Sequence, residues 1–134
     1  MPTGSLSARL DATLLERLRR ASIREQLSLS QLVERFLEEA MRVEEWPGIV
    51  FRSGPVGRRA GVVGGPDVWE IARDLDAAAA AGSADPIGTV VASTDLSEDQ
   101  VRLAAGYRAD YPDEIEARVA ADAALTARLR VGVA

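Results

Sequence analysis

The sequence predicts an α+β fold that is mostly α. Long stretches repeat apolar residues at the three-to-four spacing of amphipathic helices, while a glycine-rich stretch and residues 5–10 carry short runs typical of strands. The chain has 134 residues, enough for one ordinary domain or two very small ones. Because 47% of the residues are hydrophobic and only 4% are aromatic, we expect a largely aliphatic core.

The composition excludes several kinds of chemistry. The chain has no cysteine and no histidine, which removes thiol nucleophiles, disulfides, imidazole bases and zinc sites built on those ligands. Acidic clusters at residues 95–99 and 110–114 are the remaining metal candidates, but they stand at predicted helix starts. We therefore expect no cofactor, no metal and no enzymatic activity. No stretch approaches the roughly 20 apolar residues of a membrane span, so we expect a cytoplasmic protein without a membrane partner.

The net charge of −5 is unevenly distributed. Residues 1–24 carry five arginines against two acids, and residues 46–65 carry three arginines and no acid. Residues 66–134 carry six arginines against thirteen acids. We therefore divide the chain into a first domain at 1–45, a basic connector at 46–65 and an acidic domain at 66–134.

Residues 1–45 predict one strand and two helices. In "SLSARL", Ser5, Ser7 and Arg9 alternate with apolar residues, so they share one face of a strand. Asp11 is placed to cap the first helix, and Ser28 to cap the second. Apolar stripes follow: Leu14, Leu15, Leu18 and Ala21 in the first helix, and Leu32, Val33, Phe36, Leu37, Ala40 and Met41 in the second.

So small a domain cannot bury enough apolar surface to fold alone. Dimerisation solves this problem, because the strand can pair antiparallel with its own copy while the second helices interlock. A two-stranded ribbon of this kind fits the major groove of DNA, and its outer face would present two serines and an arginine.

This segment resembles the ribbon-helix-helix family of small repressors and antitoxins. The resemblance rests on "SLSARLD", on Leu14 and Leu18, on "LSLSQLV", and on the pair "FL" at positions 36–37. It implies that Ser5, Ser7 and Arg9 read base edges and that amides around Ser28 and Ser30 bind phosphates. Gln26 departs from the family, which usually has glycine in this turn, at a cost of about 1 kcal/mol. The alternative is a ribbon face that is merely solvated, on a domain that only dimerises.

The connector at 46–65 predicts a β-hairpin, because "IVFR" and "RRAGVV" flank the turn-forming "SGPVG". Its arginines, Arg52, Arg58 and Arg59, have two possible roles: they could contact DNA phosphates, or they could pair with the acidic domain. The second role is the more common one for a connecting hairpin.

Residues 66–134 predict about four helices. Asp67 with Glu70 and Ser97 with Gln100 form capping-box patterns, and Pro86 and Pro112 suit first helical turns. The last helix offers an apolar face made of Ile115, Val119, Leu125 and Leu129.

The stretch "VVASTDLSEDQVRLAA" has the apolar spacing of a helix-turn-helix. Its second helix opens with Glu98 and Asp99, however, which stabilise a helix start but repel DNA phosphates. We therefore expect a helix-turn-helix-like domain that binds a protein rather than DNA.

Residues 46–119 resemble a helical domain family described as VapB-type antitoxin, on the motifs "PGIVFR", "GRRA", "GPDVWEI" and "YPDEI". The family usually has an aromatic pair where this chain has Arg108. Together with the ribbon-helix-helix resemblance, this implies an antitoxin that represses its own operon and neutralises a PIN-like ribonuclease toxin. Its partners would be operator DNA, a second copy of itself and the toxin.

Arg128 and Arg130 in the tail are candidates for contact with that toxin, the alternative being solvated arginines on a frayed helix. Trp46 and Trp69 are expected to anchor the core. The alternative function is a stand-alone ribbon-helix-helix regulator whose acidic domain oligomerises or senses a ligand.

Overall fold

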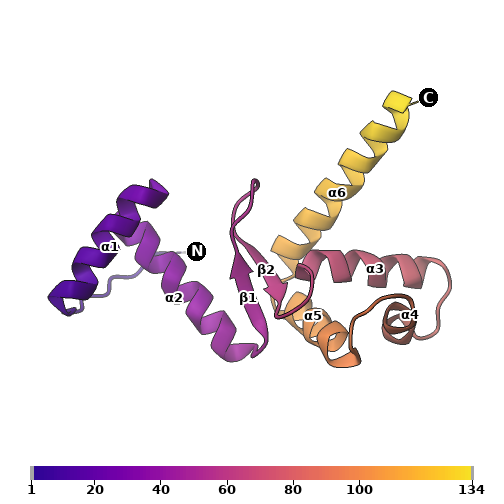
Figure 1. The fold of residues 1–134 in the computed structure, drawn as a ribbon, viewed down its shortest axis with the longest axis horizontal. Helices are drawn as coiled ribbons and strands as arrows, with labels where there is room; N and C mark the ends of the chain where they lie inside the picture. The colour runs from indigo at the N-terminus through magenta and orange to yellow at the C-terminus, as the bar shows by residue number, and fades with distance from the viewer. Residues whose placement is uncertain (1, 134) are drawn as a thin grey trace. The chain divides into compact units, whose positions relative to one another are not determined.

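The computed structural model describes residues 2–133 and divides the chain after Arg42 into two compact units (Figure 1). The described residues form six helices and one antiparallel strand pair, which confirms the predicted mostly α, α+β class. The elements are α1 (Ala12–Glu25), α2 (Leu29–Glu45), β1 (Ile49–Arg52), β2 (Arg59–Val62), α3 (Val68–Ala80), α4 (Pro86–Ser93), α5 (Glu98–Asp110) and α6 (Pro112–Val133). None of the helices in this described part is long and apolar enough to cross a membrane.

The first unit begins its helices where the sequence predicts. The Asp11 carboxylate accepts hydrogen bonds from the amides of Thr13 and Leu14, at 3.0 and 3.2 Å. At the end of α1, Gln26 adopts the left-handed conformation with φ 56°, which is the strain expected of a non-glycine residue in this turn. Ser28 and Gln31 then cap α2 reciprocally, each side chain accepting from the other residue's amide, at 3.1 and 3.0 Å.

The predicted strand at residues 5–10 is not formed in the single chain. Residues 2–10 are exposed and belong to no strand, and the only sheet within residues 2–133 lies after both helices of the first unit. A strand needs a neighbour to satisfy its backbone amides and carbonyls, and one copy of this chain offers none here. The ribbon therefore remains a prediction about a dimer.

The hairpin forms as predicted but belongs to the second unit. Its strands pair from Ile49 opposite Val62 to Arg52 opposite Arg59. Ile49, Ala60 and Val62 are buried, and β2 packs against α3. Glycine and proline in residues 46–65 thus mark the turns of a packed hairpin, and the division between the units falls near the end of α2 instead.

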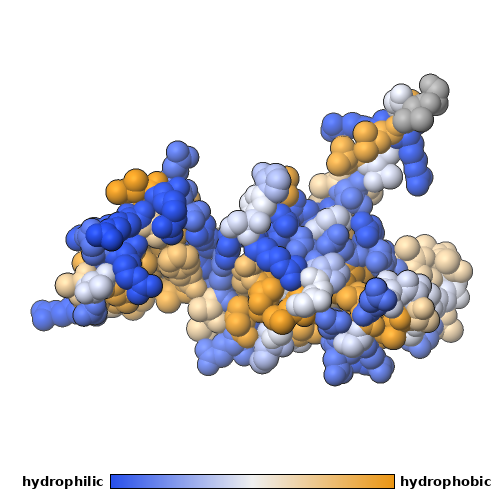
Figure 2. Space-filling model, in the orientation of Figure 1, coloured by the Kyte–Doolittle hydropathy of each residue, from blue (hydrophilic) through white to orange (hydrophobic). Residues whose placement is uncertain are grey.

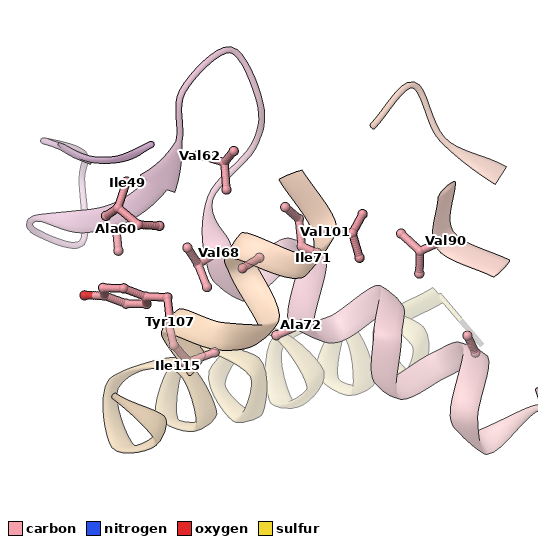
Figure 3. Packing of buried hydrophobic residues seen from close by; sticks show 12 residues of the cluster. Ile49, Ala60, Val62, Val68, Ile71, Ala72, Val90, Val101, Tyr107 and Ile115 are labelled. Atoms are coloured by element: carbon pink, nitrogen blue, oxygen red, sulfur yellow. The ribbon is translucent and has the colours of Figure 1, made fainter. Parts of the chain in front are cut away.

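Four helices complete the second unit, as predicted. α3 packs against α4, α5 and α6, and their buried side chains surround it (Figure 3). Trp46 and Trp69 are partly buried against this core, as expected of anchors. The core is aliphatic except for the fully buried Tyr107, and its labelled members are Ile49, Ala60, Val62, Val68, Ile71, Ala72, Val90, Val101, Tyr107 and Ile115.

Only the first half of α6 uses its predicted apolar face. Ile115 is buried and Val119 is partly buried against the core. Leu125 and Leu129 are 54% and 62% exposed, because this part of the helix extends beyond α3 and α5 (Figure 1). The helix continues to Val133.

Candidate DNA-binding and partner-binding surfaces

The first unit leaves most of its apolar side chains uncovered. Among its described residues only Ala21 and Leu32 are buried, whereas Phe36, Leu37 and Met41 along α2 are 40%, 50% and 55% exposed. Figure 2 shows hydrophobic residues at the surface of this unit, which a monomeric domain would normally bury. The exposed large apolar residues of the first unit are Leu6, Leu10, Leu14, Ile23, Phe36, Leu37 and Met41.

The predicted DNA-binding residues of this unit are all exposed. Ser5, Ser7 and Arg9 lie on the irregular segment before α1, and Ser28 and Ser30 lie at the start of α2. Ser28 is occupied as a cap, but the first amides of a helix have no partner inside the helix and carry partial positive charge. In one copy of the chain, the segment that carries Ser5, Ser7 and Arg9 forms no strand, so these three residues do not share a ribbon face.

Two of the three hairpin arginines are held by one carboxylate. Asp67, with only 7% of its surface exposed, accepts a hydrogen bond from Arg59 Nε and another from Arg52 Nη1 at 3.2 Å. Arg52 also donates to the carbonyl oxygens of Val62 and Gly65, at 2.7 and 2.8 Å. Of the two roles that the sequence allows for these arginines, DNA contact or pairing with the acidic domain, Arg52 and Arg59 therefore take the second. The pairing joins the hairpin to the start of α3.

The third hairpin arginine, Arg58, lines a pocket. Its Nη1 donates to Ser53 Oγ at 2.9 Å, and its side chain faces a space of about 130 Å³. The pocket lies between the hairpin, the start of α3 and the start of α6, and Arg118 from α6 contributes a further guanidinium. The full lining is Arg58, Arg59, Ala60, Trp69, Glu114, Ile115 and Arg118.

Arg108, the departure from the family pattern, has a structural role. Its guanidinium bonds both oxygens of Asp76 on α3, at 2.8 and 2.9 Å, and its Nε bonds Glu116 on α6 at 2.6 Å. Hydrogen bonds from Asp76 and then Glu116 raise the pKa of Arg108 above its usual range. Tyr107 still has an aromatic neighbour, which is Tyr111: the centroids of the two rings lie 4.9 Å apart.

The tail arginines Arg128 and Arg130 are exposed on the extended part of α6, together with Leu125 and Leu129. This combination of apolar and cationic side chains on one projecting helix is suited to contact with another protein. Figure 2 shows hydrophobic residues along the same part of the helix.

The acidic clusters do not assemble into a metal site. Within residues 2–133, no group of three or more carboxylates lies close enough together to hold an ion. Glu98 and Asp99 occupy the first turn of α5, where Glu98 pairs with Arg102 at 2.8 Å. The two residues therefore stabilise the helix start, as the sequence predicts.

No protein-family model matches the chain, and comparisons with curated proteins and with solved structures gave no significant match. The function is therefore inferred from the residues and their arrangement.

Proposed function

We propose that this protein is a cytoplasmic, dimeric DNA-binding antitoxin of a type II toxin–antitoxin pair. In this proposal the first unit binds operator DNA and represses its own operon, while the second unit binds and neutralises a PIN-like ribonuclease toxin. The observation that carries the proposal is the uncovered apolar face of α1 and α2, which calls for a second copy of the same unit.

A second copy would satisfy two needs at once. It would cover Phe36, Leu37 and Met41. Removing apolar surface from water contributes a favourable free energy of about 25 cal/mol for each Å² buried. It would also give the segment at residues 5–10 an antiparallel strand partner, burying Leu6 and Leu10 beneath the ribbon.

In that dimer, Ser5, Ser7 and Arg9 would face outward from the ribbon, where short polar side chains and an arginine can read base edges in the major groove. The amides at the start of α2 around Ser28 and Ser30 would bind the flanking phosphates. Few base contacts per ribbon make two dimers on adjacent half-sites the expected operator complex.

Charge favours a protein partner for the second unit. Residues 43–134 carry nine arginines and fifteen acids, a net charge of −6 that opposes approach to DNA. The exposed Leu125 and Leu129, with Arg128 and Arg130 beside them, offer a contact surface for the acidic active centre expected of a PIN-like nuclease.

The experiment that tests this proposal is co-expression of the full chain with the protein encoded beside its own gene. We expect that neighbour to arrest growth when expressed alone, the full chain to restore growth, and the two proteins to purify together. A neighbour that is harmless, or that stays toxic and unbound, would contradict the antitoxin role. Binding of the full chain to the DNA upstream of its gene tests the repressor role separately.

The second candidate is a stand-alone ribbon-helix-helix regulator whose second unit senses a ligand. The pocket lined by Arg58 and Arg118 is the observation behind this candidate, because a recess with two arginines in its lining can receive a small anionic molecule. Under this alternative the full chain binds its upstream DNA but purifies without a toxin.

A further inference from the structure

The pocket between the hairpin, α3 and α6 brings together residues far apart in the sequence. Arg58 and Arg59 come from the hairpin, Trp69 from the first turn of α3, and Arg118 from the second turn of α6. Arg118 also fixes the hairpin tip, since its Nη2 donates to the Val56 carbonyl at 3.3 Å. The recess is therefore framed by three elements of the same unit.

The lining is positive within an otherwise acidic unit. It contains three arginines and one acid, Glu114, which gives a formal charge of +2 in a unit whose net charge is −6. Asp67 does not cancel this charge, because it is shared between Arg59 and Arg52. The pocket can therefore attract an anion, although the unit around it is negatively charged.

The donor chemistry fits an oxyanion. A guanidinium has five N–H donors in a planar fork that matches phosphate and carboxylate oxygens. The hydrogen bond from Arg118 to the Val56 carbonyl uses one Nη2 donor and is long at 3.3 Å, so the other donors of the guanidinium can turn to a ligand. Trp69, Ala60 and Ile115 supply an apolar wall, which strengthens the charge interactions by excluding water.

The size of the pocket distinguishes a small ligand from DNA. A volume of about 130 Å³ accommodates one phosphate or carboxylate group with a short attached fragment. A DNA backbone is a continuous surface that is contacted by protruding side chains, and a recess in an acidic unit suits it poorly.

We propose that this pocket binds a single small oxyanion, a phosphate or carboxylate carried by a small molecule, with Arg58 and Arg118 supplying the attracting charge. This site is independent of the proposed DNA-binding and toxin-binding surfaces. Glu114, whose Oε1 accepts a hydrogen bond from Tyr107 at 3.0 Å, limits the affinity by adding one like charge to the lining.

The test is an NMR titration of the isotope-labelled full chain with inorganic phosphate and, separately, with succinate, at constant ionic strength. The two indole N–H signals make an internal comparison, because Trp69 lines the pocket and Trp46 does not. We expect saturable shifts at Trp69 with at least one anion and none at Trp46. Phosphate or succinate acting alone would identify the class of ligand.

Variants localise the binding. Arg118→Gln should weaken it at least about tenfold, since a charge-assisted hydrogen bond is lost. Arg102→Gln, at an exposed arginine of α5 that does not line the pocket, should leave it unchanged. Glu114→Gln should tighten it several-fold while keeping an acceptor for Tyr107, and a gain of binding cannot arise from unfolding.

Three outcomes would overturn the proposal. They are no saturable shift with either anion, equal binding by the wild type and by a folded Arg118→Gln variant, and shifts at Trp69 produced by a short DNA duplex but by neither small anion. The last outcome would assign the pocket to DNA phosphates instead.

Discussion

The two units of this chain reach stability by different routes. In the second unit, four helices and a hairpin enclose a continuous core in which Tyr107, Ile71 and Val101 are fully buried. In the first unit, two well-capped helices bury only Ala21 and Leu32 among the described side chains. Capping fixes where a helix begins, but it contributes about 1 kcal/mol per site and cannot replace a core. The difference teaches that the second unit has a core of its own, whereas the proposed dimer would have to supply one to the first unit.

Asp67→Ala is expected to have the largest effect on this contrast. It leaves Arg52 and Arg59 without their shared carboxylate and should destabilise the second unit by about 3 kcal/mol, the lower end of the cost of breaking a buried ion pair. Thermal unfolding of the full chain, followed by the near-ultraviolet signal of its tryptophans, measures this loss. Asp85→Ala, which removes only the cap of α4, should cost about 1 kcal/mol. Equal losses in the two variants would show that Asp67 acts merely as a cap.

Leu37→Asp should break the first unit without affecting the second. A carboxylate at the centre of the proposed dimer face cannot be buried unpaired, so we expect a monomer with reduced helix content and an unchanged second unit. Sedimentation velocity and circular dichroism measure the two changes. Leu129→Asp is the matched control, because Leu129 on α6 is also an exposed leucine, at 62% against 50% for Leu37, and lies outside the proposed dimer face. A wild-type chain that sediments as a monomer would contradict the dimer altogether.

Arg9→Ala should weaken binding to the operator while leaving both units folded. Loss of a bidentate base contact costs about 1–3 kcal/mol, and the melting temperature should not change because Arg9 is exposed. Electrophoretic mobility shift with the upstream DNA measures the affinity. Arg102→Ala, an equivalent loss of charge on the second unit, should bind normally. If the Arg9→Ala variant bound the DNA normally, the proposal that Arg9 reads base edges from a ribbon would be contradicted.

Arg108→Gln should have the smallest effect, a destabilisation of about 1 kcal/mol confined to the second unit. The substitution removes the ion pairs to Asp76 and Glu116, which lie at the surface and are screened by solvent. Urea unfolding at low and high salt measures the change, and the difference between wild type and variant should shrink as salt increases. A loss that is independent of salt would indicate a packing role for this side chain.

Local patterns predicted much of this fold. The caps at Asp11 and Ser28, the hairpin, and the left-handed Gln26 follow from residues within a few positions of one another, so a single sequence contains the required information. The sequence predicts a connector at 46–65 between two domains, because glycine and proline mark turns equally well in linkers and in packed hairpins.

Long-range pairings could not be predicted in the same way. Arg108 bonds Asp76, 32 residues away, and the chain offers 16 arginines and 21 acids among which sequence alone gives no choice. For the same reason the sequence does not single out Arg118, because only the fold brings it to the pocket that Arg58 also lines. Leu125 and Leu129 continue a helical apolar stripe, and periodicity does not reveal where the core beneath a helix ends. The DNA-binding residues remain predictions, since their ribbon requires a second chain.

The shared carboxylate of Asp67 also has a consequence for cooperativity. A two-stranded hairpin with four residues in each strand is marginally stable by itself, and its backbone amides would exchange rapidly with solvent. Because Arg52 and Arg59 fasten both strands to the first residue before α3, hairpin and helix should open together as one unit. The amides of Val50 and Gly61, which face each other across the two strands, should then exchange as slowly as those in the middle of α3. The hairpin then becomes a sensitive reporter of global unfolding of the second unit.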